Sequence, residues 1–167
     1  MKKIAMKLKF IKFIATGFAS GLSPKAPGTA GSLAYLFLHF LFFLLFPNLL
    51  YLKFEFILAF SVCLSAFIFT KLALINSVFS SNKDPQQIVI DEWAGLSIAL
   101  IGAPFNAYGF VSSFLLFRFF DITKPGPVKK FDDMPGTKGI VLDDIVAGIL
   151  ALLCRIAIDF IVLKLST

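Results

Sequence analysis

The chain has 167 residues, of which 58% are hydrophobic, and it carries a formal net charge of +6. Soluble domains are typically about 45–50% apolar, so much of this chain must face something other than water, and lipid is the simplest candidate. Its 22 phenylalanines lie within apolar runs instead of alternating with a basic stripe, which argues against nucleic acid as a partner. We expect a single membrane-embedded domain, residues 1–167, whose positive charge faces anionic lipid head groups.

The N-terminal segment, residues 1–19, has lysines ahead of a short apolar stretch that a further lysine interrupts, and no small-x-small cleavage site follows. This pattern favours an interfacial or partly inserted amphipathic helix over a cleaved signal peptide. The next segment, residues 21–32, is dense in glycine, proline and hydroxyl side chains and precedes an apolar run. Backbone amides at the start of a helix can bind an anion, so Ser23, Lys25 and Thr29 are candidate phosphate ligands.

Five apolar runs follow, and a helix needs roughly 20 mostly apolar residues to span a bilayer. The runs cover residues 33–50, 54–75, 93–103, 108–120 and 145–163. The third and fourth runs are short and flank a turn, so we interpret them as one out-and-back hairpin. The sequence therefore predicts an all-α polytopic bundle with about four membrane-inserted helices in addition to the N-terminal helix.

Counting the crossings places the polar segments between these runs on one side of the membrane. Most lysines and arginines, Lys83 among them, then fall on that side, which the positive-inside rule makes cytoplasmic; Lys53 and Lys164 fall opposite. The acids of that face are Asp84, Asp91, Glu92, Asp121, Asp132, Asp133, Asp143 and Asp144. This convergence predicts a single site that faces the cytoplasm.

Two segments with adjacent acids echo each other. The doublet Asp91–Glu92 is followed by Gly95, and the doublet Asp143–Asp144 by Gly148. We expect each doublet just before or within the first turn of a helix, where the dipole stabilises negative charge, and each glycine to let another helix or a ligand come close. Capping is the alternative explanation, but one cap needs only one acid. Adjacent carboxylates raise each other's pKa unless a cation lies between them, and carboxylate oxygens suit Mg²⁺.

A further acid, Asp121, is expected at a helix C-terminus, where the dipole disfavours it unless it has a cationic partner. Arg118, Lys124 or a metal ion could be that partner, and Lys124 in its proline-rich turn can bind phosphate. The candidate catalytic and metal-binding residues are therefore Asp91, Glu92, Asp121, Asp143 and Asp144, with Arg118 and Lys124 as further phosphate ligands.

Other conspicuous residues are assigned structural roles. His39 lies in an apolar run away from the polar segments, and Cys63 and Cys154 are expected to be buried thiols. Phosphatase chemistry based on a cysteine or on a pair of histidines is therefore not expected. Arg155 and Asp159 are four residues apart on one helix face, and we interpret them as a structural or snorkelling pair.

Four segments of the chain together resemble the phosphatidylglycerophosphatase A family. In the family's order, between Gly17 and Leu152, they are residues 21–33, 91–95, 117–125 and 143–148. The resemblance implies an integral enzyme of the bacterial cytoplasmic membrane that removes the terminal phosphate of phosphatidylglycerophosphate with Mg²⁺, giving phosphatidylglycerol. It also implies that the five acids named above form the site. Residues 132–139 depart from the glycine-rich stretch expected there, which leaves the role of Lys138 open.

Three rival interpretations stay open. The enzyme could act on another lipid, such as an isoprenoid phosphate, or the chain could be a small transporter, because intramembrane acids can mark ion paths. A structural membrane adaptor is the third. The residues are compatible both with attack by metal-activated water and with a nucleophilic aspartate.

Overall fold

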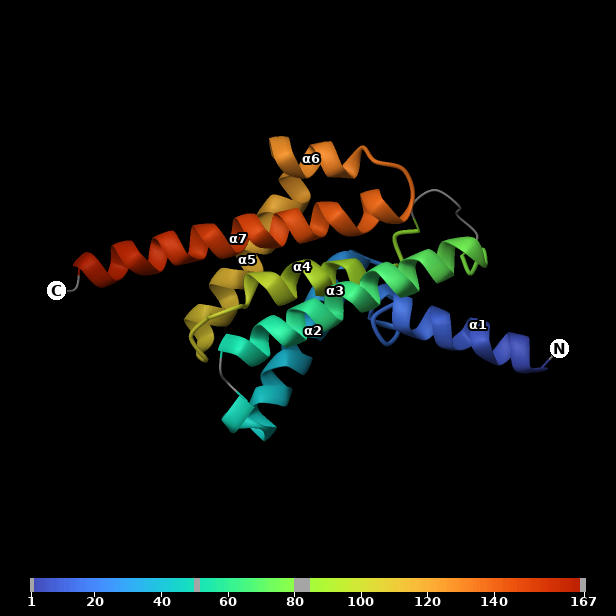
Figure 1. The fold of residues 1–167 in the computed structure, drawn as a ribbon, viewed down its shortest axis with the longest axis horizontal. Helices are drawn as coiled ribbons and strands as arrows, with labels where there is room; N and C mark the ends of the chain where they lie inside the picture. The colour runs from blue at the N-terminus through green and yellow to red at the C-terminus, as the bar shows by residue number, and fades with distance from the viewer. Residues whose placement is uncertain (1, 50–51, 80–84, 166–167) are drawn as a thin grey trace.

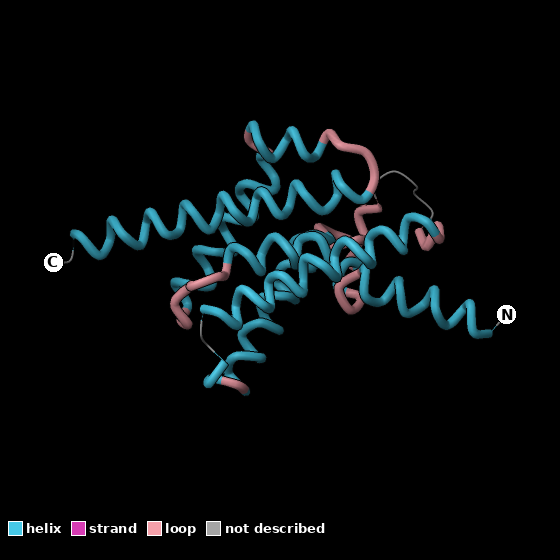
Figure 2. Tube along the Cα trace, viewed as in Figure 1, coloured by secondary structure: helices cyan, strands magenta, loops and turns pink. Residues whose placement is uncertain are grey.

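The computed structural model describes residues 2–49, 52–79 and 85–165. Within these residues the chain folds into seven α-helices and two short 3₁₀ helices, without a strand (Figures 1 and 2). The elements are α1 (Lys2–Ala15), η1 (Ser20–Leu22), α2 (Pro27–Leu45), η2 (Pro47–Leu49), α3 (Leu52–Ile75), α4 (Ile90–Ala99), α5 (Ala107–Thr123), α6 (Gly126–Asp132) and α7 (Thr137–Leu165). The predicted all-α class is confirmed; Lys83 and Asp84 of the predicted polar face lie outside the described residues.

Three helices, α2, α3 and α7, are long and apolar enough to cross a membrane. Their outward side chains include Phe37, Phe60 and Phe160, which are 63%, 70% and 65% exposed. Large apolar side chains exposed along whole helices need a lipid environment, because water would drive them into contact with one another. The chain is therefore a multi-pass membrane protein, as predicted.

The start of the chain forms a separate helical arm. α1 packs its inner face, with Ile11 and Ala15 buried, against α3 and exposes Ile4 and Phe10, and Figure 1 shows it extending away from the bundle. With 14 residues it is shorter than a membrane span, and its interfacial position stays a prediction. α2 begins at Pro27, so the second half of the glycine- and proline-rich segment, residues 21–32, is helical.

α4 is the central helix of the bundle. It contacts α2, α3, α5 and α7, and Figure 1 shows it between α3 and α7. It has only 10 residues, and nearly all of them are buried. α4 and α5 together form the predicted short hairpin. Because α4 is enclosed on several sides, the surrounding helices fix the position of the acids in its first turn.

α4 and α7 cross at two glycines. A Cβ atom on Gly148 would collide with the carbonyl group of Gly95, and a Cβ atom on Gly95 would lie 2.5 Å from the carbonyl oxygen of Asp144. The two backbones are thus in direct contact, which only residues without a side chain permit. The predicted close approach is confirmed, and the approaching partner is a helix at each glycine. The crossing brings the acidic doublets of the two helices to one place.

α7 begins earlier than expected. Its first residue is Thr137, so Asp143 and Asp144 lie more than a turn inside the helix. The prediction of a doublet just before or within the first turn is right for α4, which begins at Ile90, and wrong for α7. No proline interrupts the stretch before Asp143, and Val141 packs in the core, so the helix extends. Because the dipole effect falls off within the first turn, it does not stabilise these two acids.

The far end of α4 is held by charged groups from α3 and α7. Arg155 of α7 is only 1% exposed; it donates to the carbonyl oxygen of Ile101 (2.5 Å) and pairs with Asp159 (2.8 Å). Glu55 of α3 accepts a hydrogen bond from the amide of Gly102 (2.6 Å). Arg155 is thus a buried structural group, as one of the two interpretations held, and it does not snorkel.

Candidate active site

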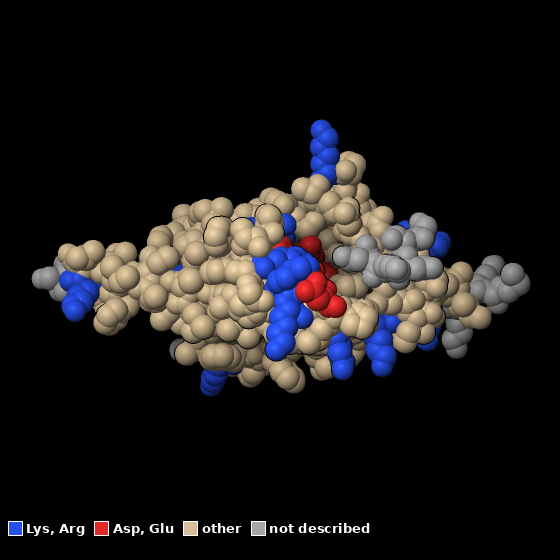
Figure 3. Space-filling view, turned by 90° about the horizontal axis from the view of Figure 1, so that it is seen from above, with Lys and Arg blue, Asp and Glu red and all other residues tan. Residues whose placement is uncertain are grey.

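A pocket of about 530 Å³ lies where the beginnings of α2 and α4, the end of α5 and the first half of α7 meet. Figure 3 shows acidic and basic side chains gathered in one hollow of the surface. The charged side chains that line the pocket are Asp91, Glu92, Arg118, Asp121, Lys124, Asp132, Asp143 and Asp144. Acids from separate segments of the sequence thus converge, as predicted.

Three carboxylates form the centre of this pocket. Asp91 and Glu92 come from α4 and Asp144 from α7, and one carboxylate oxygen of each lies within 4.8 Å of the other two. Asp91 and Asp144 are only 6% and 5% exposed. Within the described part of the chain, the buried Glu92 Oε2 and Asp144 Oδ1 have no hydrogen-bond partner. Three carboxylates this close together and largely shielded from solvent repel one another, so the arrangement calls for a cation.

Burial dominates the protonation of the two acids of α4. It raises the pKa of Glu92 to about 7, and the nearby Asp121 carboxylate adds to the rise. Burial also raises the pKa of Asp91, and the neighbouring Glu92 and Asp144 carboxylates raise it further. A cation placed among these groups would lower both pKa values, because it stabilises the ionised form.

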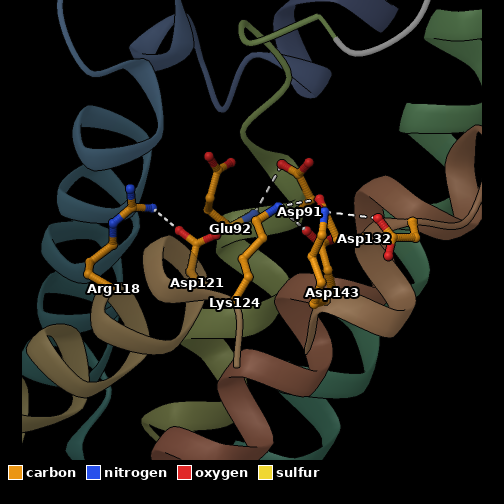
Figure 4. A network of polar contacts seen from close by, with 9 residues as sticks. Asp91, Glu92, Arg118, Asp121, Lys124, Asp132 and Asp143 are labelled. Carbon is orange, nitrogen blue, oxygen red and sulfur yellow. Dashed lines mark hydrogen bonds and ion pairs between the residues drawn. The ribbon is translucent and has the colours of Figure 1, made fainter. Parts of the chain in front are cut away.

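Arg118 provides the cationic partner that Asp121 needs at the end of α5. Its Nη1 lies 2.6 Å from Asp121 Oδ2, and both side chains are 15% exposed (Figure 4). The first turn of α2 packs onto this region, since a Cβ on Gly28 would collide with the Glu92 carboxylate and lie 3.3 Å from Arg118 Nη1. Of the two cationic side chains considered for Asp121, Arg118 is the one that pairs with it, and a metal ion as a further partner stays a prediction. An arginine so held lies beside the carboxylate cluster, where it can meet a phosphate.

Lys124 joins three helices at the rim of the same pocket. It caps the C-terminus of α5, and its ammonium group donates to Asp132 of α6 and to Asp143 of α7, the latter at 2.8 Å (Figure 4). Partial burial disfavours the charged form, but these hydrogen bonds outweigh burial and raise the pKa of Lys124. Asp143 uses Oδ2 for this contact, and its buried Oδ1 has no partner among the described residues.

Capping does not account for both acidic doublets. The N-cap residue of α4 is Val89, without a side-chain cap, while Asp91 in the first turn accepts from the amide of Glu92 (3.1 Å) and so satisfies one amide of this helix end. Asp143 and Asp144 lie inside α7, where no backbone amide needs a cap. These two acids therefore line the pocket without satisfying a helix end.

Not every predicted phosphate ligand reaches the pocket. Thr29 lines it, whereas Ser23 and Lys25 are not part of its lining. The hydroxyl of Ser23 donates to the carbonyl oxygen of Lys25 (2.8 Å), which closes the turn before α2, and the Lys25 side chain is exposed. A role for these two residues in phosphate binding stays a prediction.

Sequence reasoning missed Asp132 as a site residue. Asp132 was expected only on the acidic face, yet it lines the pocket and holds Lys124. The signal that could have indicated it is the Asp132–Asp133 doublet, which ends α6. His39, by contrast, is packed as expected, against the rings of Tyr35 and Phe43.

Known proteins resemble this chain over most of its length. The family model of phosphatidylglycerophosphatase A matches residues 13–159. The chain is 38% identical over 141 residues to phosphatidylglycerophosphatase A of Escherichia coli K12, which covers 83% of this chain and 77% of that protein. It is 36% identical over 162 residues to the protein of the same name from Haemophilus influenzae, which covers 96% and 94% of the two chains.

A third relative, from Bacteroides thetaiotaomicron, is provisionally described as a phosphatidylinositol-3-phosphatase. It is 35% identical over 151 residues, which cover 81% of this chain and 85% of that protein. No solved structure matches the chain significantly. The matched residues include the whole pocket. The chain belongs to the phosphatidylglycerophosphatase A family and is a lipid phosphatase of the membrane.

Proposed function

We propose that the chain hydrolyses phosphatidylglycerophosphate to phosphatidylglycerol and inorganic phosphate, with Mg²⁺ held by the carboxylate cluster. The observation that supports this most is the composition of the pocket, where three clustered carboxylates face an arginine and a lysine from the end of α5. Carboxylates alone would repel a phosphate dianion. A site that binds a hard cation and a phosphate together uses both sets of groups.

The residues present fit a divalent cation of the Mg²⁺ type. Asp91, Glu92 and Asp144 offer only carboxylate oxygens, two of which are buried without a partner in the described chain. A hard cation would bind these oxygens and remove the repulsion among the three groups. When bound, such an ion polarises phosphoryl oxygens and lowers the pKa of a water molecule. Asp143 Oδ1 is available as a further ligand, whereas Asp121 is held by Arg118.

The remaining polar groups would hold the substrate. Arg118 and Lys124 would supply positive charge to the phosphoryl oxygens, and the backbone amides of Gly28 and Thr29, which line the pocket in the first turn of α2, would add hydrogen bonds to an anion. The bond between phosphorus and the glycerol oxygen breaks, and charge builds on the phosphoryl oxygens as it does so. The Arg118 and Lys124 side chains stabilise that charge because their positions are fixed before the reaction.

The attacking group separates two routes. Water can attack phosphorus directly, or a site aspartate can form an aspartyl-phosphate that water then hydrolyses. Acid quenching of a reaction with substrate labelled at the terminal phosphate tests the second route. Label that stays on the protein supports the aspartate nucleophile, and its absence at all times of sampling supports direct attack by water.

A second candidate substrate has a specific observation behind it. The Bacteroides relative is described as acting on a phosphorylated inositol lipid, so the same pocket could take a phosphomonoester on a different head group. An isoprenoid phosphate is the other alternative. These candidates share a terminal phosphate at the membrane surface and differ in the group that carries it.

We propose that the site faces the cytoplasm of a bacterial cell, in the inner membrane. The support is the charge distribution, because Lys124, Lys129 and Lys138 lie at the pocket end of the bundle and Lys53 at the other end of α3. The positive-inside rule places the lysine-rich end in the cytoplasm. The substrate would then be reached from the cytoplasmic leaflet.

The function is tested with purified protein in mixed micelles. Phosphate release is measured from phosphatidylglycerophosphate, phosphatidylinositol-3-phosphate and an isoprenoid monophosphate, with Mg²⁺ and with a chelator. We expect the highest kcat/KM for phosphatidylglycerophosphate, no release in chelator, and loss of activity in Asp144→Asn. Asp133→Asn is the matched control, because Asp133 is 64% exposed and pairs with Lys129. A higher kcat/KM for another lipid, or full activity in chelator, would refute the proposal.

A further inference from the structure

Lys124, the C-cap residue of α5, connects this helix to α6 and α7 through ion pairs. Its ammonium group donates to Asp132, the last residue of α6, and to Asp143 of α7 (2.8 Å). The Lys124 side chain is 31% exposed. A lysine this exposed would have many conformations in solvent if it had no partner, so the two carboxylates select the one observed.

α6 lies against α7. The helix has seven residues, and its one buried residue, Val128, packs in the core. Gly126 at its start and Gly136 after its end have no atom within 4 Å of an added Cβ, so α6 is held through its middle and its charged end. Within the described chain, α6 and its C-cap residue Asp133 form three ion pairs. Lys129 pairs with Asp132 and Asp133, which lie on or next to its own helix. Only the pair between Asp132 and Lys124 connects α6 to another helix.

The ammonium group has capacity left for a ligand. A lysine has three N–H donors, and Asp132 and Asp143 take two of them. Lys124 lines the pocket, and Figure 4 shows it among the carboxylates of that pocket. Two fixed acceptors determine the direction of the third donor, since the three N–H bonds keep a tetrahedral arrangement.

We propose that Asp132 is a positioning residue for Lys124, whose third donor it directs toward a phosphate group in the pocket. The inference rests on the proposed function, in which Lys124 binds the substrate phosphate. Asp132 itself does not touch the phosphate. Losing Asp132 leaves Lys124 with Asp143 as its one fixed acceptor, so its other donors are no longer directed and phosphate binding weakens, while the groups that carry the chemical step stay in place.

Charge alone predicts the opposite result. Asp132 is a negative group close to the place of a dianion, so its removal would strengthen phosphate binding if repulsion dominated. Positioning predicts weaker binding after the same change. The sign of the effect therefore separates the two explanations.

The test compares Asp132→Asn with Asp133→Asn in the full chain, using the lipid substrate and inorganic phosphate as a competitor. Asp133 also pairs with Lys129, at 2.8 Å, but is 64% exposed and does not pair with Lys124, so its variant matches the change in charge and place. A hydrogen bond to a charged group contributes a factor of at least about ten to affinity. A donor that is no longer directed at the phosphate loses part of this factor. We expect Asp132→Asn to raise KM and the Ki of phosphate about three- to tenfold with kcat within about twofold, and Asp133→Asn to leave all three unchanged.

Lys124→Ala and the double variant complete the cycle. Asp132→Asn should add nothing to Lys124→Ala, because it acts through Lys124. If Lys124→Ala weakens phosphate binding but Asp132→Asn leaves KM and Ki unchanged or lower, or lowers only Tm, positioning is refuted and the proposed function stands. If Lys124→Ala itself has no effect, Lys124 does not bind the phosphate, and its assignment and this inference fail together.

Discussion

The contact between α4 and α7 makes Gly148→Ala a sensitive probe of the site. The added Cβ would lie 2.2 Å from the carbonyl oxygen of Gly95, and ordinary contact begins at 3.4 Å. The obstacle is backbone, which cannot turn aside, so the helices must separate by about 1 Å. Overpacking of this kind costs about 1–3 kcal/mol. A functional constellation tolerates only about 0.5 Å of displacement, so Asp91 and Asp144 should lose their shared geometry.

The assay measures thermal unfolding in detergent, with and without Mg²⁺, and the Mg²⁺ concentration that gives half-maximal activity. We expect Gly148→Ala to lower Tm and to raise that concentration, so that Mg²⁺ stabilises the variant less than the parent. Gly126→Ala is the control, since no atom lies within 4 Å of the added Cβ. An alanine at position 148 with unchanged Tm and unchanged Mg²⁺ requirement would refute the role assigned to the crossing.

Three further predictions concern pH, stability and orientation. In the metal-free protein the pKa of Glu92 is raised from 4.5 to about 7. Between these pH values the folded state holds more protons than the unfolded state, so the free energy of unfolding should fall as pH rises through this window. The free energy of unfolding of Glu92→Gln should fall less over the same pH range, and an equal fall would contradict the assignment. Arg155→Leu should lower the free energy of unfolding by about 3–5 kcal/mol, because Asp159 loses its ionic partner and the carbonyl of Ile101 loses its donor. Lys138→Leu, at an exposed lysine of the same helix, serves as the comparison, and equal Tm values of the two variants would argue against the network. The topology is tested with single cysteines in a background without the native cysteines. A cysteine in place of Lys129 should react with an impermeant reagent only from the cytoplasmic side of sealed vesicles, and one in place of Lys53 only from the other side. Labelling of both positions from one side would refute the topology.

Helices could be predicted from the sequence wherever a single physical rule determines their position. Long apolar runs identify α2, α3 and α7, because backbone groups in lipid must be paired within a helix. The start of α7 could not be placed in this way, since the polar residues from Thr137 onward are compatible with a loop or a helix. The packing of Val141 against the core decides between them, and packing is not visible in a local pattern.

The site was predictable in its residue types and less so in its pairings. Adjacent acids followed by glycine indicated both the cluster and the crossing, because close contact of two helices needs a residue without a side chain. The partner of Asp121 could not be chosen, since Arg118 and Lys124 lie equally near it in the sequence. Lys124 instead reaches Asp132 and Asp143, which depends on how α6 folds back onto α7. The presence of Glu55 within an apolar run is explained by the hydrogen bond that it accepts from the amide of Gly102, and the sequence alone does not show this contact.

We propose that Asp91, Glu92 and Asp144 together hold the divalent cation of this lipid phosphatase. Anomalous diffraction from crystals soaked in Mn²⁺ locates the ion independently of activity. We expect a peak within coordination distance of one carboxylate oxygen from each of the three residues, and no peak there in Asp144→Asn. A peak at another place, or an unoccupied cluster at saturating Mn²⁺, would contradict the proposed site.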